Sequence, residues 1–556
     1  MIDTALLHGW SGVALAFTTV EAPLIAGLVR GRSAIRHYIL SPLVAAPLTA
    51  IVAGGIALSS ACLAHWGFAH HGLLQWTAGT GLGAFLGYSG GYAISQTGAD
   101  DQSHQRGSFV ADSARSGASR SRQSGRTSEI SLAGTAVPAQ DEAKHFKLIG
   151  TTGTGKSTAI QEIVSGALAR GDRAVIADPD GGYLKRFYRP DRGDVVLNPF
   201  DGRSVRWDLF SEIKSSYDVE QLSRSLIPDH DGQDRSWRGY ARTFFTSVTR
   251  QMHEAGVREV DELYRQLVVA DSAELRELVR GTAAQPFLDE HNSRMFDSIR
   301  SVTSSAVEPL QYIARQKAQA FSIREWVRAK SPGVLFIPYK AGQIAALRST
   351  ISAWMRLAIF ETMDQDEQGD EDSRDSNGRL WFVVDELDAL GQIDGLKDAL
   401  ARLRKFGGRC VLGFQSIAQV SSTYGQGEAH TIIENCGNTL ILRCSASEGG
   451  GTARFASQLI GEREVLRKTV SRSRRQTELF GSVTHGEHRS VEAAVLPSQV
   501  EQLPDLAGYL KYASDPRWQR VRLDAKQAWQ EHRSGEAAMQ AGQAGKTRER
   551  EGPEYG

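Results

Sequence analysis

Short apolar runs alternate with longer mixed segments through the chain beyond the N-terminal part. With their polar ends, the runs lie at residues 145–149, 173–179, 333–339, 380–386, 409–416 and 439–445. Uninterrupted apolar runs of this length are typical of strands that are buried on both faces of a parallel sheet. Because helical patterns lie between them, the sequence predicts an α/β fold with a mostly parallel, doubly wound sheet. In such a sheet a ligand binds outside the carboxyl ends of the strands.

The N-terminal part has long uncharged stretches instead. Residues 38–64 and 73–96 contain no charged side chain and are long enough to cross a bilayer. Arginines precede and follow this pair, whereas the loop between the two stretches has no Lys or Arg. The positive-inside rule therefore places both flanks in the cytoplasm. We predict a transmembrane anchor over residues 1–96; a pair of buried core helices is the alternative.

An earlier apolar stretch, residues 5–29, contains Glu21. A carboxylate inside a membrane is costly, so the stretch is either a third span with a functional acid or an interfacial segment. Residues 97–128 are rich in Ser, Gly, Arg, Gln and Asp, and they predict a flexible linker. Residues 530–556 have the same character and predict a disordered tail.

The first apolar run leads into a glycine-rich loop. Residues 150–157 read GTTGTGKS and match G-x-x-x-x-G-K-[ST] at every fixed position, and apolar residues at helical spacing follow. Between a strand and a helix, the backbone N–H groups of such a loop surround a phosphate; a simple flexible turn is the alternative. Lys156 is expected to reach the β- and γ-phosphates, and Ser157 to bind Mg²⁺. The predicted nucleotide-binding residues are Gly150, Thr151, Thr152, Gly153, Thr154, Gly155, Lys156, Ser157 and Thr158.

Two later strands end in residues that suit phosphate chemistry. Asp385 is expected to hold the Mg²⁺ shell, and Glu386 to orient or deprotonate the attacking water. Alternatively, the two acids cap the helix that follows them. Gln415 ends the next run, where it either senses the γ-phosphate or positions water, or only satisfies a loop. The paired acids favour hydrolysis over simple nucleotide storage.

The overall composition sets few limits on function. The 64 Lys and Arg residues balance the 64 Asp and Glu residues, so no global field argues for nucleic acid. Basic clusters lie at residues 401–409 and 462–476, but such clusters are more often solvated faces than nucleic-acid sites. The four cysteines show no metal-ligand spacing, and we expect reduced thiols.

Several phrases in order resemble one family. They are HFKLIGTTGTGKS, VIADPDGGYLKRFY, NPFDGRSVRWDLFSEI, LWFVVDELDALGQIDGL and LPSQVEQLPDLAGYL, from about residue 130 to 515. This order resembles the type IV coupling proteins of bacterial conjugation, the TraD/TraG-like receptors that are related to FtsK/HerA-type motors. The loop alone indicates only a P-loop; the NPFDGRSVRWDLFSEI phrase and the strand ending at Gln415 are what indicate this family.

The resemblance implies an architecture and a function. It implies a RecA-like P-loop motor domain formed by residues 129–210 and 329–529, with an all-α domain, residues 211–328, inserted in it. It implies a multi-pass protein of the bacterial inner membrane whose motor domain is cytoplasmic. It further implies a homohexameric ATPase, using ATP and Mg²⁺, that brings a relaxase–DNA complex to a type IV secretion channel. Such an ATPase would translocate single-stranded DNA without reading its sequence.

The resemblance also implies an arginine that reaches the γ-phosphate of a neighbouring subunit. The matching position is Arg404, with Arg402 and Arg443 as alternatives. The expected catalytic residues are therefore Lys156, Glu386, Gln415 and Arg404, and the expected metal ligands are Ser157 and Asp385.

Two other functions stay open at the level of sequence. One is a recruitment receptor that uses ATP only as an assembly switch, which the paired acids disfavour. The other is a DNA pump of the FtsK or HerA type in another system. A chromosomal pump of the FtsK type would carry a winged-helix module after the motor, and the short polar end of this sequence is not expected to hold one.

Overall fold

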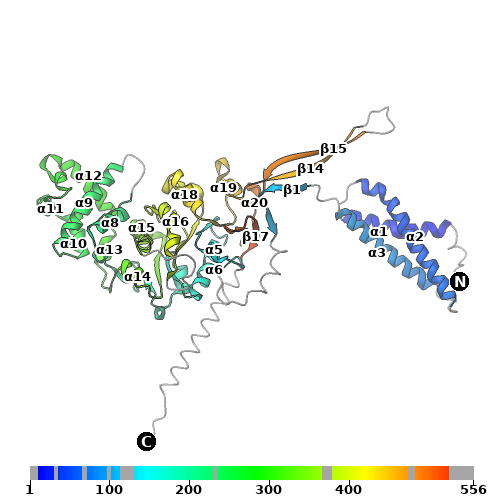
Figure 1. Cartoon of the computed structure of the whole chain (residues 1–556), viewed down its shortest axis with the longest axis horizontal. Helices are drawn as coiled ribbons and strands as arrows, with labels where there is room; N and C mark the ends of the chain where they lie inside the picture. Colours follow the sequence, from blue (N-terminus) through cyan, green and yellow to red (C-terminus); the bar gives the residue numbers. More distant parts are fainter. Residues whose placement is uncertain are drawn as a thin grey trace, which may run out of the picture. The chain divides into compact units, whose positions relative to one another are not determined.

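The computed structural model describes residues 10–30, 35–65, 72–96, 102–112, 130–228, 235–365, 378–473 and 482–524 (Figure 1). The chain divides into two compact units. The smaller unit contains Met1–Arg106 and Glu464–Glu492, and the larger unit contains Gly107–Arg463 and Ala493–Gly556. The predicted disordered tail, 530–556, lies outside the described residues.

The helices of the smaller unit are α1 (Trp10–Arg30), α2 (Ile35–His65) and α3 (Gly72–Gln96). Glycines allow α1 and α3 to approach until their backbones touch. A Cβ at Gly87 would collide with the carbonyl oxygen of Val20, and a Cβ at Gly91 with that of Leu24. The first apolar stretch is therefore a helix packed against α3.

The two predicted membrane spans are both helical. Among the described helices, however, α2 alone has the length and hydropathy of a span, over His37–Gly55 with a mean hydropathy of 1.6. One such helix is weak support for a membrane location, because the core helix of a soluble protein passes the same test. The many Gly, Ser and Thr residues of α3 lower its hydropathy. Multi-pass insertion therefore stays a prediction.

A polar three-stranded sheet, in the order β1-β14-β15, accompanies these helices. Its strands are β1 (Gln102–Gly107), β14 (Glu462–Ser473) and β15 (Ser482–Ala493), and β2 (Val110–Asp112) follows β1. The structure differs here from the predicted flexible linker, because β1 and β2 lie within residues 97–128. Their polar side chains do not prevent backbone pairing with an open sheet edge. Residues 113–129 lie outside the described part.

A ten-stranded sheet organises the described part of the larger unit, in the order β2-β17-β16-β13-β5-β12-β11-β6-β10-β7. The strands from β13 to β7 in this order are all parallel to one another, whereas β16 is antiparallel to β13 and β17. The predicted α/β fold is confirmed, and each predicted run forms a parallel strand. The strands are β5 (Phe146–Ile149), β6 (Arg173–Pro179), β7 (Val195–Val196), β10 (Val334–Tyr339), β11 (Leu380–Val384), β12 (Gly408–Phe414), β13 (Asn438–Ile441), β16 (Ala507–Lys511) and β17 (Trp518–Arg522).

Both faces of this sheet are buried, as the continuous apolar runs predicted. In β11, Phe382 and Val384 face one core, while Trp381 and Val383 face another. Helix α6 (Lys156–Ala169) packs into the second core, and α15 (Ala341–Met363) into the first. The smaller helices around the sheet are α5 (Ala139–Glu142), α7 (Gly182–Phe187), α14 (Ile323–Ala329), α16 (Leu396–Arg402), α17 (Ile417–Tyr424), α18 (Gln426–Asn435), α19 (Gly451–Ile460) and α20 (Pro497–Glu501).

Helices fill the segment between β8 (Arg206–Trp207) and β9 (Ala320–Phe321). The parallel pairing of these two strands brings the two ends of the segment together. They are α8 (Ser216–Leu226), α9 (Arg235–Glu254), α10 (Val260–Tyr264), α11 (Ser272–Leu278), α12 (Ser293–Val307) and α13 (Leu310–Ala314), gathered at one end of the larger unit (Figure 1). Their apolar side chains continue the core on one face of the sheet. The predicted all-α domain, residues 211–328, contains these helices and also the short strand β9; the domain and its boundaries stay a prediction.

Candidate nucleotide site

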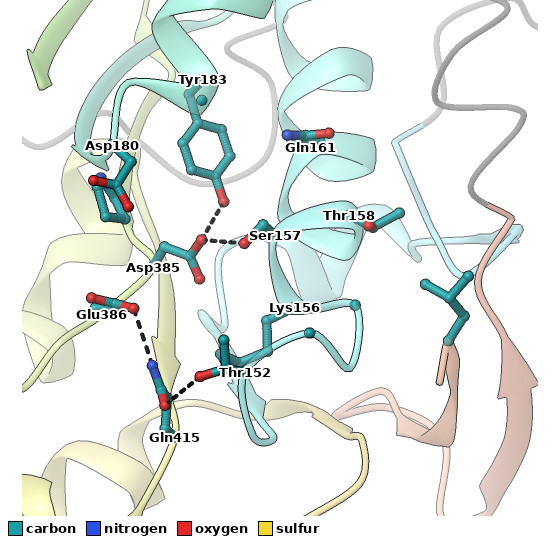
Figure 2. A pocket seen from close by; sticks show the side chains of 15 residues that line it. Thr152, Lys156, Ser157, Thr158, Gln161, Asp180, Tyr183, Asp385, Glu386 and Gln415 are labelled. Atoms are coloured by element: carbon teal, nitrogen blue, oxygen red, sulfur yellow. Dashed lines mark hydrogen bonds between the residues drawn. The ribbon is translucent and has the colours of Figure 1, made fainter. Parts of the chain in front are cut away.

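The glycine-rich loop connects β5 to α6 at the carboxyl edge of the parallel strands. A pocket of about 310 Å³ opens beside it (Figure 2). The residues that follow β6, β11 and β12 line the same pocket, and these strands stand side by side with β12 next to β5. Parallel topology thus brings together polar side chains that lie far apart in the sequence.

The loop has the shape of a phosphate cradle. Gly155 has a φ of 113°, in the left-handed region that favours glycine, and a Cβ there would lie 2.8 Å from a methyl carbon of Leu506. Within the loop, the hydroxyl of Thr154 donates to the carbonyl oxygen of Thr151 at 2.7 Å. The N–H of Leu506 donates to the carbonyl oxygen of Thr154 at 3.0 Å, so the segment before β16 supports the loop from outside.

Lys156 extends under this loop. Its ammonium nitrogen donates to the carbonyl oxygens of Gly150 at 2.7 Å and Thr151 at 3.3 Å. Burial lowers the pKa of Lys156, and the charges of Asp385 and Glu386 oppose that shift. A cation held this way, near the N-terminus of α6, gives the pocket the positive potential that a polyphosphate requires.

Ser157 and Asp385, the two predicted metal ligands, meet in the pocket. The hydroxyl of Ser157 donates to Oδ2 of Asp385 at 2.7 Å. The same oxygen accepts a hydrogen bond of 2.8 Å from the hydroxyl of Tyr183, as Figure 2 shows. Hydroxyl and carboxylate oxygens are the hard ligands that Mg²⁺ prefers. Magnesium usually keeps several waters and binds substrate phosphates, so phosphate oxygens and water would complete this shell.

A second chain of contacts connects the loop to Glu386. The hydroxyl of Thr152 donates to Oε1 of Gln415 at 2.9 Å, and the amide nitrogen of Gln415 donates to Oε1 of Glu386 at 3.1 Å (Figure 2). Burial and the neighbouring Asp385 raise the pKa of Glu386, while the Gln415 contact lowers it. Gln415 is therefore positioned between the loop and the predicted base.

The three arginines considered for the γ-phosphate are absent from the described lining of this pocket. Arg404 is exposed, and its charge acts on His145, which precedes β5, whereas the loop follows β5. Arg402 is also exposed, at the end of α16. Arg443 lies nearer the loop and pairs with Asp505 at 2.7 Å. Arg404 therefore lies away from the pocket of its own chain, and its role toward the γ-phosphate of a neighbouring subunit stays a prediction.

Several pocket residues were not predicted as site residues. Helix α7 contributes Tyr183 to the pocket lining, and the turn before α7 contributes Asp180. Helix α6 contributes Gln161, and the segment before β16 contributes Leu506. A signal for the first two was present, because DGGY, residues 180–183, directly follows the parallel strand β6 and must reach the same edge as the loop. Leu506 had no such signal, since its place depends on the antiparallel pairing of β16 with β13.

The sequence profile of the type IV secretion-system coupling protein DNA-binding domain matches residues 129–524. The chain belongs to the type IV coupling protein family. Coupling protein TraD of Escherichia coli K12 is 30% identical over 395 residues, which cover 70% of this chain and 54% of TraD. The chain thus spans about half the length of this relative. The resemblance to coupling proteins found in the sequence is confirmed.

Solved structures of one coupling protein share the fold. The bacterial conjugative coupling protein TrwBdeltaN70, in its unbound monoclinic form, is 29% identical with a TM-score of 0.67, and the match covers 76% of this chain and 93% of that chain. TrwB in complex with ADP and Mg²⁺ is 29% identical with a TM-score of 0.65, over 76% of this chain and 94% of that chain.

Proposed function

We propose that the chain is a membrane-anchored ATPase that couples a relaxase–DNA complex to a type IV secretion channel and translocates single-stranded DNA during conjugation. One observation carries this proposal. The glycine-rich loop, the acids Asp385 and Glu386, and Gln415 converge on one pocket in a chain of the coupling protein family. Storage of a nucleotide would require the loop alone, whereas the acids and the amide suit hydrolysis.

The residues of the pocket fit ATP with Mg²⁺, and TrwB has been solved with ADP and Mg²⁺. A Cβ at Gly153 would meet no atom within 4 Å, so the loop is open there, and its backbone N–H groups can meet phosphate oxygens. Ser157 and Asp385 would hold the ion, which when bound neutralises phosphate charge. Lys156 would bind the β- and γ-phosphates, and Glu386, with Gln415 beside it, would orient or deprotonate the attacking water.

The smaller unit supports the membrane anchor in this proposal. The span over His37–Gly55 is only 22% buried, and large apolar side chains are exposed along the helices. Among them are Ile39 (73% exposed), Leu43 (71%) and Phe85 (68%), which lipid could cover. We propose a multi-pass location in the bacterial inner membrane, with the motor in the cytoplasm. We also propose a homohexamer, because Arg404 is remote from the pocket of its own chain and is expected to reach the γ-phosphate of a neighbouring subunit.

The experiment is an ATPase assay on the full chain in lipid nanodiscs, with and without single-stranded DNA of mixed sequence. DNA should raise the turnover several-fold, and rising salt should reduce the effect steeply, because phosphate contacts release counterions. Lys156→Ala, assayed in parallel, reports any contaminating ATPase.

Turnover that ignores DNA at low and moderate salt would overturn translocation. ATP-dependent assembly with no turnover would indicate instead the recruitment receptor that uses ATP as a switch. Stimulation by double-stranded DNA alone would favour a pump of the FtsK or HerA type.

A further inference from the structure

We propose that Tyr183 is a positioning residue for the metal site: its hydroxyl holds the carboxylate of Asp385 in the orientation that receives Mg²⁺. This inference rests on the proposed nucleotide function, and it adds a residue that lies outside the glycine-rich loop and the pair Asp385–Glu386. The juxtaposition is direct, because the hydroxyl of Tyr183 donates to Oδ2 of Asp385 at 2.8 Å (Figure 2).

The turn after β6 brings Tyr183 to this place. Asp180 and Gly181 have φ values of 59° and 70°, so two consecutive left-handed residues reverse the chain into α7. The carboxylate of Asp178 then accepts the N–H groups of Tyr183 at 3.1 Å and Leu184 at 2.7 Å. With Asp178 itself buried, the first turn of α7 is fixed relative to the end of β6. The ring of Tyr183 therefore points to β11 from a defined backbone.

Asp385 receives two donors on one oxygen. Ser157 of α6 approaches Oδ2 from the loop side at 2.7 Å, and Tyr183 of α7 approaches it from a different element. The other oxygen, Oδ1, packs against β12, since a Cβ at Gly413 would lie 3.1 Å from it. Asp385 is only 4% exposed, so water cannot replace a lost donor readily. Removing Tyr183 would leave Ser157 as the single hydroxyl that holds the carboxylate.

This arrangement matters for a metal more than for a nucleotide alone. A magnesium ion demands near-ideal octahedral geometry, so a ligand that rotates loses affinity for the ion. Outer contacts that fix a ligand commonly change metal affinity about 10- to 100-fold when they are removed. The phosphates, in contrast, would be held by the loop and by Lys156, whereas the hydroxyl of Tyr183 donates to Asp385. Loss of the hydroxyl should therefore separate metal affinity from phosphate affinity.

The test uses Tyr183→Phe in the full chain in nanodiscs, because this change removes one oxygen and keeps the ring. The first measurement is the ADP affinity in EDTA, and the second is the Mg²⁺ concentration that half-saturates the ADP complex. Electron paramagnetic resonance of Mn²⁺ then counts the bound ion directly. We expect ADP affinity in EDTA to stay within about twofold and the Mg²⁺ requirement to rise about tenfold or more. Tyr512→Phe is the matched control, since its buried hydroxyl donates to the carbonyl oxygen of Thr135 at 2.9 Å, away from the pocket.

A double-mutant cycle keeps the result interpretable if Tyr183→Phe also lowers stability. If Tyr183 acts through Asp385, Tyr183→Phe should have little further effect on Mg²⁺ affinity in the Asp385→Asn background. If the effects of Tyr183→Phe and Asp385→Asn on Mg²⁺ affinity are additive, the role of Tyr183 is overturned. It is also overturned if Tyr183→Phe requires no more Mg²⁺ than Tyr512→Phe. Either result would leave the proposed function intact. A wild-type chain whose ADP binding does not respond to Mg²⁺ would overturn the proposed metal site, and this inference with it.

Discussion

Lys156 illustrates how the site is built at the scale of single residues. Its ammonium contacts the carbonyl oxygens of Gly150 and Thr151, the first residues of its own loop. A phosphate oxygen carries charge and forms hydrogen bonds that are about twice as strong as those of a neutral acceptor. An incoming polyphosphate can therefore take over these contacts without a change of fold, because the lysine already lies beneath the loop.

This placement predicts a binding defect for Lys156→Ala. The loss of a charged hydrogen-bond donor costs about 1.5–3 kcal/mol, so we expect nucleotide affinity to fall about 10- to 150-fold. Titration of a fluorescent ATP analogue measures it. Lys185→Ala on α7 is the control, because Lys185 is exposed and does not line the pocket. Equal affinities for the two variants would contradict a phosphate role for Lys156.

The contact between Thr152 and Gln415 predicts a defect in turnover instead. Thr152→Ala removes the donor that orients the amide of Gln415 toward Glu386, while Thr152→Ser keeps it. A neutral hydrogen bond contributes about 0.5–1.5 kcal/mol, so we expect turnover to fall about 2- to 10-fold in Thr152→Ala and to stay near wild type in Thr152→Ser. Steady-state kinetics at saturating ATP distinguishes the two. The same loss in both variants would show that the methyl group, not the hydroxyl, is what matters.

At the scale of elements, the start of β5 depends on a histidine that must stay neutral. His145 has a φ of 56°; its Nε2 lies 2.9 Å from the carbonyl oxygen of Leu400, and its Nδ1 accepts the N–H of Cys410 at 3.0 Å. Burial lowers the pKa of His145 to about 4, and the charges of Arg409 and Arg404 act in the same direction. Protonation of Nδ1 would break the contact with β12 and place a charge in the core.

The sign of the resulting pH dependence follows from linkage. In the unfolded chain His145 titrates near 6.5, so its contribution to stability is complete above that pH and is lost as pH falls toward about 4. The loss amounts to about 3 kcal/mol at most, from about 1.4 kcal/mol for each pH unit between the two pKa values. Urea unfolding from pH 7.5 to 4.5, followed by tryptophan fluorescence, should show this slope. His145→Gln, which cannot titrate, should have a shallower slope, and an unchanged slope would exclude His145 as its source.

The elements that sequence could predict are those whose own residues specify them. The parallel strands have continuous apolar runs because both of their faces are buried, and the loop after β5 has a fixed motif. Strands β16 and β17 lack such runs, since their place depends on antiparallel pairing with β13 and with each other. Leu506, which these strands bring to the loop, was therefore missed. Strands β1 and β2 were missed for the same reason, because pairing partners far along the chain, β14 and β17, create them.

Arg404 raises a question that belongs to the whole molecule. In its own chain it lies toward the amino end of β5, while the loop and Glu386 lie at the carboxyl edge of the sheet. One chain therefore cannot bring Arg404 and Glu386 to the same phosphate. In a ring with one repeated interface, each chain could supply Arg404 to the pocket of its neighbour. Hydrolysis would then be a property of the interface between two chains.

Mixing two inactive variants tests this shared site. Glu386→Gln should bind ATP and hydrolyse almost none, and Arg404→Ala should do the same, because an arginine supplied in trans can contribute about 10³-fold or more in rate. In randomly mixed rings, about a quarter of the interfaces should combine an intact Glu386 with an intact Arg404, since each group is present in half of the chains. ATPase activity should therefore return after mixing to about that fraction of wild type.

The control for mixing is Arg443→Ala, because the side chain of Arg443 pairs with Asp505 of its own chain, next to Leu506, whose N–H supports the loop. A defect caused by this change lies in the pocket of the same chain. An inactive Arg443→Ala chain would therefore have a damaged loop of its own but could still supply an intact Arg404 to its neighbour. The Arg443→Ala chain keeps Glu386, but its own glycine-rich loop is damaged. Mixing it with Glu386→Gln should therefore restore little ATPase activity. Recovery with Arg404→Ala but not with Arg443→Ala would establish Arg404 as the group that acts across the interface. If Arg404→Ala alone retains its DNA-independent turnover, Arg404 serves another purpose, and the pocket hydrolyses ATP with the residues of one chain.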